Sequence, residues 1–305
     1  NTLVLQEAKS SSEVENYVTT QDELFQADLH IADAISPAAK EVARYREALT
    51  HGLERMRQQQ GILSNSTLIA LFQLLKNSSE GFRHGSGTVV KNQRTGATVF
   101  VPPQGLASVQ QHMQALERFI NTPGTDEPAL DPLIKMALVH HQFESIHPFS
   151  DGNGRIGRII CVLNLVQAGL LDAPVLYLSR YINQHKGDYY RLLQDVRDQS
   201  GQPAAWQAWV QFMLRAVAQT AQQAVQLVSG MRDLMSHTKH RMRTELPKLY
   251  SQDLLNNLFR HPYTRIEFVQ RDLGVTRQTA SRYLRQLAQA GFVQEHSLGK
   301  HSYFI

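Results

Sequence analysis

The residues best suited to chemistry lie together in one short segment, 147–158. Gly152 and Gly154 flank Asn153 directly before apolar residues at helical spacing, namely 156, 159, 160, 163 and 166. The glycines therefore lie at a helix N-terminus, where free backbone N–H groups and the helix dipole favour an anion. Because glycine has no side chain, a phosphate can approach this backbone closely. The pattern predicts a phosphate-binding turn.

Charged and titratable residues surround this turn. Arg155 and Arg158 are three residues apart on one helix face, where they would hold further phosphates. Asp151 lies at the rim, where a carboxylate could hold Mg²⁺ that bridges phosphate oxygens. His147 could act as a general base. A glycine pair alone more often just caps a helix, but these residue types together favour a polyphosphate site with a metal ligand and a base.

The elements that position this segment are mostly helices, because most of the chain has helical periodicity. The exception in the first 250 residues is a pair of β-rich runs, 88–90 and 97–101, on either side of a polar turn. They predict a hairpin that Pro102-Pro103 ends, since proline cannot donate to a ladder. Helices are predicted at 24–35, 38–57, 66–75, 106–120, 132–144, 155–167, 189–196 and from 203 towards 243.

The residues from 251 onward form a separate unit that is similar to a winged helix-turn-helix domain. Helices are predicted at 253–259, 264–273 and 277–290, followed by strands at 292–293 and 303–305 around a Gly299-Lys300 turn. Residues 265–305 hold six Arg/Lys and three Asp/Glu, which gives modest support for DNA binding. Protein contact or dimerisation is the alternative. The possible DNA-contacting residues are Arg277, Ser281, Arg282, Arg285 and Lys300.

Composition narrows the class of protein. With 42% hydrophobic and 19% charged residues, whole-chain disorder is excluded. The net charge, 31 − 27 = +4, is too small to indicate a nucleic acid without a local patch. The single cysteine, Cys161, excludes an internal disulfide or multi-cysteine metal site and favours a reducing compartment.

No apolar run reaches the roughly 18 residues of a membrane helix. No signal-peptide pattern opens the chain, which begins without Met. We expect a cytoplasmic protein with no membrane partner, and leave open a removed targeting segment.

The segment 147–158 contains His-x-Phe-x-Asp-Gly-Asn-Gly-Arg-x-x-Arg in full and so resembles the signature of the Fic (Fido) family. Residues 137–146 also look like the family's lead-in helix, and the resemblance extends from about residue 11 to 212. It implies a mainly α fold, with a Fic helical core and a β-hairpin flap, here followed by the winged helix-turn-helix domain. It also implies a protein adenylyltransferase, which moves AMP from ATP to a Ser, Thr or Tyr hydroxyl of a target protein.

The resemblance implies a role for each matching position. His147 would take the proton from the target hydroxyl, and Asp151 would bind Mg²⁺ between the α- and β-phosphates of ATP. Phe149 would anchor the loop by packing. The Doc kinase branch carries Lys in place of Gly154 and lacks the second arginine, so phosphorylation is disfavoured. The implied ATP-binding residues are Gly152, Asn153, Gly154, Arg155 and Arg158, with Tyr189 and Tyr190 bordering the adenine.

The hairpin resembles the family's flap, and Phe82-Arg83 before it resembles the family's [Phe/Tyr]-Arg lead. A flap binds the target segment by strand addition, which brings its hydroxyl to the base. An ordinary structural hairpin is the alternative. The residues that would line nucleotide and target are Ala97, Thr98, Val99 and Phe100.

Residues 11–16 match the family's inhibitory pattern, [Ser/Thr]-x-x-x-Glu-[Gly/Asn], with Ser11 as its first position. The pattern precedes the 147–158 segment, as in class II of the family. It implies that Glu15 pairs with Arg158 and displaces it from the γ-phosphate. A solvated acidic helix start is the alternative.

These expectations define three domains: an N-terminal helical region with the inhibitory motif (1–80), a Fic core with flap and catalytic loop (81–243), and the winged helix-turn-helix domain (244–305). The predicted function is an autoinhibited AMP transferase that uses ATP and Mg²⁺. The alternatives are an enzyme that removes AMP, with Glu15 catalytic, and a nucleotide-sensing DNA-binding regulator. Expected partners are an unknown target protein, the chain itself through self-modification, DNA, and a second copy in a homodimer.

Overall fold

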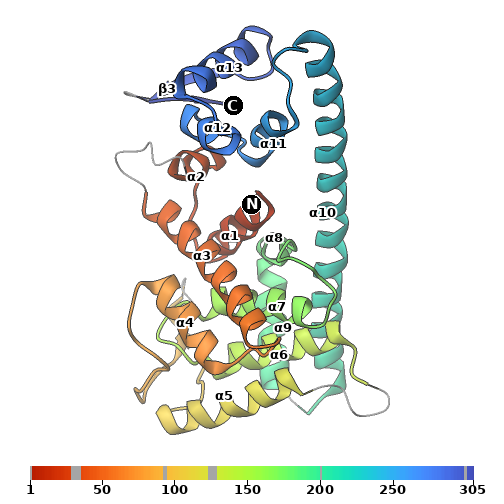
Figure 1. Cartoon of the computed structure of the whole chain (residues 1–305). Helices are drawn as coiled ribbons and strands as arrows, with labels where there is room; N and C mark the ends of the chain where they lie inside the picture. Colours follow the sequence, from red (N-terminus) through yellow and green to blue (C-terminus); the bar gives the residue numbers. More distant parts are fainter. Residues whose placement is uncertain (1, 29–35, 92–94, 123–128, 200, 299–300) are drawn as a thin grey trace. The chain divides into compact units, whose positions relative to one another are not determined.

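The computed structural model describes residues 2–28, 36–91, 95–122, 129–199, 201–298 and 301–305. Across these ranges the chain is mainly helical, with thirteen helices and two small two-stranded sheets (Figure 1). The helices are α1 (Thr2–Val14), α2 (Gln21–Asp28), α3 (Pro37–Gln58), α4 (Asn65–Lys76), α5 (Leu106–Asn121), α6 (Pro132–Ile146), α7 (Asn153–Gln167), α8 (Leu178–Gln184), α9 (Lys186–Asp198), α10 (Pro203–Glu245), α11 (Gln252–Arg260), α12 (Ile266–Leu273) and α13 (Arg277–Gln289). The strands are β1 (Val90–Lys91), β2 (Thr98–Phe100), β3 (Glu295–Leu298) and β4 (His301–Phe304).

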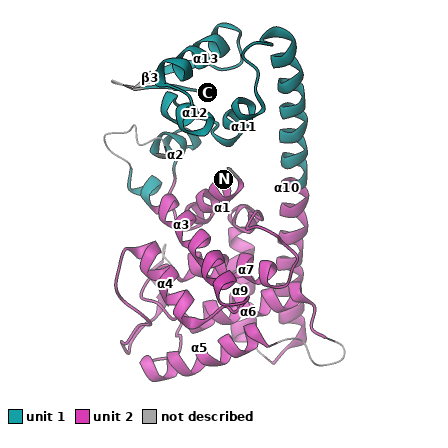
Figure 2. Cartoon of the chain, viewed as in Figure 1, with its two compact units in different colours: residues 1, 19–40, 225–305 teal, residues 2–18, 41–224 magenta. Residues whose placement is uncertain are grey.

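The chain forms two compact units (Figure 2). The core unit comprises Thr2–Val18 and Glu41–Ala224, and the C-terminal unit comprises Thr19–Lys40 and Val225–Ile305. The boundaries of the two units differ from those of the three predicted domains, because α2 belongs to the same unit as the C-terminal residues. The predicted three-domain division stays a prediction.

Helix α7 is the centre of the core unit, and α6 packs against it. Its apolar residues are buried on all sides, among them Ile156, Ile159 and Leu163. The sequence accounts for the N-terminal end of each of these two helices. Asp131 caps α6 through hydrogen bonds from two backbone N–H groups, and Gly152 starts α7 with a φ of 75°, which favours glycine.

Helix α1 packs against α7 and α8 of the core unit. Helix α8 was not expected, because its seven residues are too few to show a helical period. Its buried residues Leu178 and Ile182 join the cluster that surrounds Trp209 of α10. The cluster fixes α1 beside the start of α7.

In the C-terminal unit, α11, α12 and α13 enclose a core to which Leu254, Val269, Leu284 and Phe304 contribute. Thr276 caps α13, as predicted, by accepting a hydrogen bond from a backbone N–H. Strands β3 and β4 pair antiparallel over four residue pairs. The C-terminal domain is therefore present with its helices close to the predicted bounds.

The first wing strand was predicted too early, at 292–293. Gly291 adopts a φ of 72°, and the Phe292 N–H closes the end of α13 on the carbonyl of Leu287. Phe292 and Val293 then pack on the core of the C-terminal unit, so they serve the helix end and the strand begins at Glu295. The turn residues Gly299 and Lys300 lie outside the described residues.

Helix α2 packs on this same unit through aromatic rings. The ring of Phe25 stacks on Tyr263 at 4.9 Å between centroids, and Tyr263 stacks on Tyr303 at 5.6 Å. Asp22 accepts a hydrogen bond from the Tyr263 hydroxyl. Contacts between segments so far apart in the sequence leave no local pattern.

Among the described residues, no helix combines enough length with enough apolar character to cross a membrane.

Candidate active site

The loop from 147 to 152 joins α6 to α7 and is held by its own side chains. Asn153 accepts a hydrogen bond from the Phe149 N–H and donates one to the Phe149 carbonyl, both 2.9 Å. The buried ring of Phe149 stacks on Phe72 at 4.4 Å and lies 5.4 Å from Phe82. Phe149 thus packs as expected. The Asn153 side chain is taken up by these two hydrogen bonds within the loop. Of Asn153, only the backbone N–H is therefore left at the helix start to bind an anion.

His147 follows the last turn of α6 in a left-handed conformation, with φ 51° and ψ 58°. Burial and the positive charges of Arg83 and Arg197 lower the pKa of His147 to about 4, against the opposing effects of the Glu144 backbone and Asp151. The imidazole is therefore neutral at pH 7. A neutral ring has the lone pair that a general base needs.

Gly152, Asn153 and Gly154 form the first turn of α7, whose N–H groups have no partners within the helix. Asp151 is exposed beside this turn, and its carboxylate lies 2.6 Å from Lys76 Nζ. Burial alone would raise the pKa of Asp151, but hydrogen bonds from Lys76 and the Gly152 N–H lower it. The carboxylate is therefore ionised and at the rim of the turn.

Arg155 is 1% exposed and points away from water. It forms an ion pair with Glu41 of α3 and lies over the ring of Tyr17, 5.4 Å from its centroid. Its Nε is buried without a hydrogen-bond partner. The predicted phosphate ligand therefore has a buried Nε without a partner and a carboxylate partner that the sequence did not indicate.

Arg158 is also 1% exposed and is held by α1 and the residue that follows it. Its Nε donates to Ser11 Oγ at 2.8 Å, and its Nη2 donates to the Ser11 carbonyl at 3.0 Å and to Glu15 Oε1 at 2.9 Å. Burial alone would lower the pKa of Arg158, but Glu15 raises it. The contact between Glu15 and Arg158 that the motif implied is present.

Glu15 also lies directly over the turn. A Cβ placed on Gly154 would be 2.5 Å from Glu15 Oε1 and 3.0 Å from Arg158 Nη1. The carboxylate thus occupies the space above the helix N-terminus that an anion would enter.

The hairpin of β1 and β2 pairs Val90 with Phe100 and Lys91 with Thr98, with an irregularity between the pairs. Ala97, Thr98 and Val99 are exposed. The half-buried Phe100 lies under Arg197, whose guanidinium is 4.3 Å from the ring centroid. Arg197 also donates to the Glu144 carbonyl and to Ser145 Oγ. The hairpin is thus joined to the end of α6 just before His147.

The two tyrosines of α9 differ in position. Tyr189 is buried and its hydroxyl lies 2.8 Å from His140 Nε2. Tyr190 is 47% exposed and packs edge-on against Tyr189. Tyr190 therefore has the ring face that a base could reach, while Tyr189 supports it from the core.

The predicted DNA-contacting residues lie mainly on α13 of the C-terminal unit. Arg282 and Arg285 are exposed, whereas Ser281 is half-buried. Arg277 forms an ion pair of 2.7 Å with Glu267, which reduces its availability to a phosphate. Lys300 lies outside the described residues.

Four residues around the site were not among the predicted functional residues: Glu41, Lys76, Arg83 and Arg197. Each is a charged residue, and Glu41, Lys76 and Arg197 lie on α3, α4 and α9. A single charged residue on a helix is usually exposed to solvent, so the local sequence gives no sign of a role in the site. Only Arg83 has a signal in the sequence, because Phe82-Arg83 resembles the family's lead to the hairpin.

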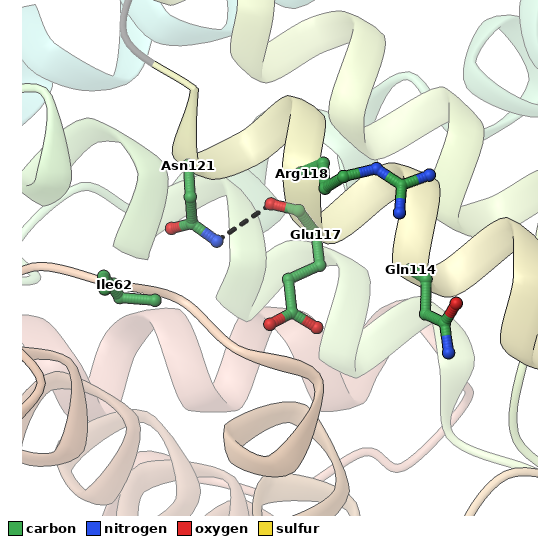
Figure 3. Close-up of a pocket in the computed structure, with 5 residues that line it drawn as sticks. All are labelled: Ile62, Gln114, Glu117, Arg118 and Asn121. Carbon is green, nitrogen blue, oxygen red and sulfur yellow. Dashed lines mark hydrogen bonds between the residues drawn. The ribbon is translucent and has the colours of Figure 1, made fainter.

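A pocket of about 370 Å³ lies between α5 and the segment before α4 (Figure 3). Two of its polar residues, Asn121 and Glu117, are hydrogen-bonded within the fold. Asn121 donates to the Glu117 carbonyl at 2.8 Å, and the Glu117 carboxylate accepts from the Asn65 N–H at 3.1 Å. Its lining residues, Ile62, Gln114, Glu117, Arg118 and Asn121, include none of the predicted site residues.

Family models match three parts of the chain. The model described as Fic/DOC family matches residues 62–165, and the one described as Fic/DOC family N-terminal matches residues 1–54. The model described as protein adenylyltransferase SoFic-like, C-terminal domain, matches residues 234–305.

Two curated relatives are similar to part of the chain. A probable protein adenylyltransferase of Aquifex aeolicus is 43% identical over 58 residues, 19% of this chain and 18% of that protein. The protein adenylyltransferase Fic of Drosophila melanogaster is 33% identical over 92 residues, 30% of this chain and 17% of that protein. The chain thus spans less than a fifth of the length of these relatives.

Solved structures share the fold at lower identity. A Fic family protein from Desulfovibrio desulfuricans has a TM-score of 0.61 and 20% identity, and covers 99% of this chain and 85% of its own. A Fic domain containing signaling protein from Bacteroides thetaiotaomicron has a TM-score of 0.61 and 17% identity, with coverages of 75% and 88%. The arrangement of helices is therefore shared well beyond the region of sequence identity.

Proposed function

The chain belongs to the Fic/DOC family, and we propose that it is a protein adenylyltransferase that transfers AMP from ATP to a hydroxyl group of a target protein. Relatives that carry this activity in their names support a nucleotidyltransferase at the level of the family. One observation carries the proposal for this chain. A neutral histidine, His147, is the first residue of the loop that leads into the start of α7, where backbone N–H groups have no partners within the helix.

The chain's own residues supply the proposed chemistry. The N–H groups of the α7 turn and the Arg155 and Arg158 guanidinium groups would hold the phosphates. His147 would accept the proton of the target hydroxyl as its oxygen bonds to the α-phosphorus. The bond between the α-phosphorus and its bridging oxygen breaks, and pyrophosphate leaves. Positioning and charge stabilisation dominate such transfers.

The residues present fit a magnesium ion that is bound together with the nucleotide. Among the described residues, no group of three or more His, Cys, Asp or Glu side chains could hold a metal ion. Magnesium commonly binds through one carboxylate plus substrate phosphates, and the ionised, exposed Asp151 offers such a carboxylate. The ion would neutralise phosphate charge.

We assign an inhibitory role to Glu15 within the same proposal. Its carboxylate takes one Nη of Arg158 and fills the space above Gly154. ATP would have to displace it before the phosphates reach either group. A charge-assisted hydrogen bond contributes about 1.5–3 kcal/mol, and each 1.36 kcal/mol is a factor of about ten. Glu15→Gly should therefore raise transfer by about tenfold or more.

The test is label transfer from α-labelled ATP with Mg²⁺, comparing the parent chain with Glu15→Gly. Glu13→Gly is the matched control, because Glu13 lies in the last turn of α1, two residues before Glu15, and forms its ion pair with Lys9 rather than with Arg158. More label on protein with Glu15→Gly alone supports the proposal. Equal labelling of all three chains would contradict inhibition, and no labelling by any chain that still binds ATP would contradict transfer.

Removal of AMP is the alternative activity of the same site, with Glu15 orienting the attacking water. It reverses the sign of the test, because Glu15→Gly would then lose activity on a target that already carries AMP.

Two arginines of α13, Arg282 and Arg285, are exposed. They favour duplex DNA as a second partner, which the C-terminal unit would bind. Filter binding over a salt titration tests this, since phosphate contacts weaken with salt. Binding that does not change in Arg282→Ala or Arg285→Ala would contradict it.

A further inference from the structure

Arg83 bonds to three consecutive carbonyl groups of the catalytic loop. Its Nε donates to the His147 carbonyl at 2.7 Å, and its Nη2 donates to the Ile146 carbonyl at 3.3 Å. Its backbone N–H donates to the Pro148 carbonyl at 2.9 Å. One residue, 7% exposed, therefore fixes the backbone on both sides of the proposed base.

The same guanidinium reaches both legs of the flap. Its Nη1 donates to Thr88 Oγ1 at 3.4 Å before β1, and its Nη2 donates to the Pro103 carbonyl at 2.5 Å after β2. A guanidinium is rigid and planar, so it fixes the distance between the groups that it joins. The flap and the loop of His147 are thus held by one planar group.

His147 needs this support, because its backbone is left-handed. Helix ends with this conformation usually have Gly or Asn, since other side chains crowd the backbone there. The Arg83 hydrogen bonds hold the carbonyl groups on both sides of this strained residue in place. Without them, the loop could relax to a conformation in which the imidazole faces elsewhere.

We propose that Arg83 is a positioning residue, which holds His147 in its left-handed conformation and sets the flap at a fixed distance from it. The inference rests on the proposed function, because it assumes that His147 acts on a hydroxyl that the flap presents. Arg83 touches neither phosphate nor hydroxyl in this role.

The experiment compares Arg83→Gln and Arg83→Lys in the Glu15→Gly background. A displaced base costs up to about a hundredfold in rate, so we expect kcat for AMP transfer to fall by about that factor in both variants. The KM for ATP should stay near that of the parent. Lysine keeps the charge but lacks the planar fork, so it should not rescue kcat.

A second readout needs no activity. The His147 titration is followed by NMR, with its signal identified by its loss in His147→Ala. The charge of Arg83 lowers the pKa of His147, so we expect the pKa to rise in Arg83→Gln and to stay low in Arg83→Lys. The combination of low kcat and unchanged pKa in Arg83→Lys separates positioning from charge.

Gln104→Ala is the matched control for the flap. Gln104 accepts a hydrogen bond from the Thr88 N–H at 3.1 Å and donates to the Thr88 carbonyl at 3.0 Å, so it supports the flap through bonds within the flap itself. We expect a higher KM for the target and an unchanged His147 titration.

The proposal is overturned if Arg83→Gln keeps the parent's kcat and His147 pKa, or if Gln104→Ala changes both equally. If the Glu15→Gly chain itself transfers no AMP, the proposed function fails, and the titration still tests the contact between Arg83 and His147.

Discussion

At the scale of single residues, the proposed function places inhibition and nucleotide binding in competition for the space above Gly154. Since a Cβ on Gly154 would lie 2.5 Å from Glu15 Oε1, a methyl group there would take the space of the carboxylate and, under the proposed function, that of a phosphate. We expect Gly154→Ala to weaken ATP binding by about tenfold or more even without Glu15. Calorimetric titration in the Glu15→Gly background measures this. Gly187→Ala, at a helical glycine whose Cβ meets open space, is the control, and equal affinity for both chains would remove this explanation.

The lowered pKa of His147 also predicts how the rate of AMP transfer depends on pH. Burial, with Arg83 and Arg197, lowers its pKa to about 4, and only the neutral ring can accept a proton. The kcat/KM of Glu15→Gly for AMP transfer reports groups of the free enzyme. It should stay level as pH falls from neutral, and then decline as pH falls through about 4. A decline centred near the ordinary histidine pKa of 6.5 would show that the imidazole is solvated.

At the scale of elements, α1 is held in the core unit by a buried carboxylate. Glu7 Oε1 accepts from the Tyr45 hydroxyl at 3.0 Å, and Oε2 accepts from the Ser179 N–H at 3.1 Å. Burial raises the pKa of Glu7 to about 7, although these hydrogen bonds and Arg158 act against it. The folded chain therefore binds more protons than the unfolded chain between pH 4.5 and about 7.

This proton binding makes the stability of the helix that leads to Glu15 depend on pH. The free energy of unfolding should decrease with rising pH across that window, by about 3 kcal/mol at most. Glu7→Gln removes this titration, so its stability should change less between pH 5 and pH 8 in denaturant unfolding. Glu13→Gln, on the partly exposed face of the same helix, should keep the parent's pH dependence. An unchanged slope in Glu7→Gln would contradict the assignment.

The helices with long apolar periods could be predicted from the sequence almost to their ends, as α5 shows. The His147–Arg158 motif also gave the loop and the start of α7, since local spacing determines both. The roles of Glu41 and Lys76 could not be predicted from the spacing of residues. Each reaches the site from a helix that is distant in the sequence, and no local motif marks it. The short α8 and the first wing strand were missed because tertiary packing, rather than periodicity, decides those segments.

At the scale of the whole molecule, the C-terminal unit is built from two stretches that are far apart in the sequence. Phe25 of α2 is 8% exposed and stacks on Tyr263. Phe25→Ala should therefore cost about 3 kcal/mol in the unfolding of this unit and raise hydrogen exchange in α2. Val225→Ala, at a 66% exposed position of the same unit, should have little effect. Equal stability of the two variants would show that α2 is only loosely attached.

Because two separate stretches of sequence form the C-terminal unit, they limit which chimeras of this chain can fold correctly. A chimera that exchanges only residues 225–305 for those of a relative would offer Phe25 and Asp22 a foreign surface, because their partner Tyr263 belongs to the exchanged part. The mismatch would arise seven residues from Glu15, on the same stretch of backbone. A chimera that preserves this unit has to take residues 19–40 and residues 225–305 from the same protein.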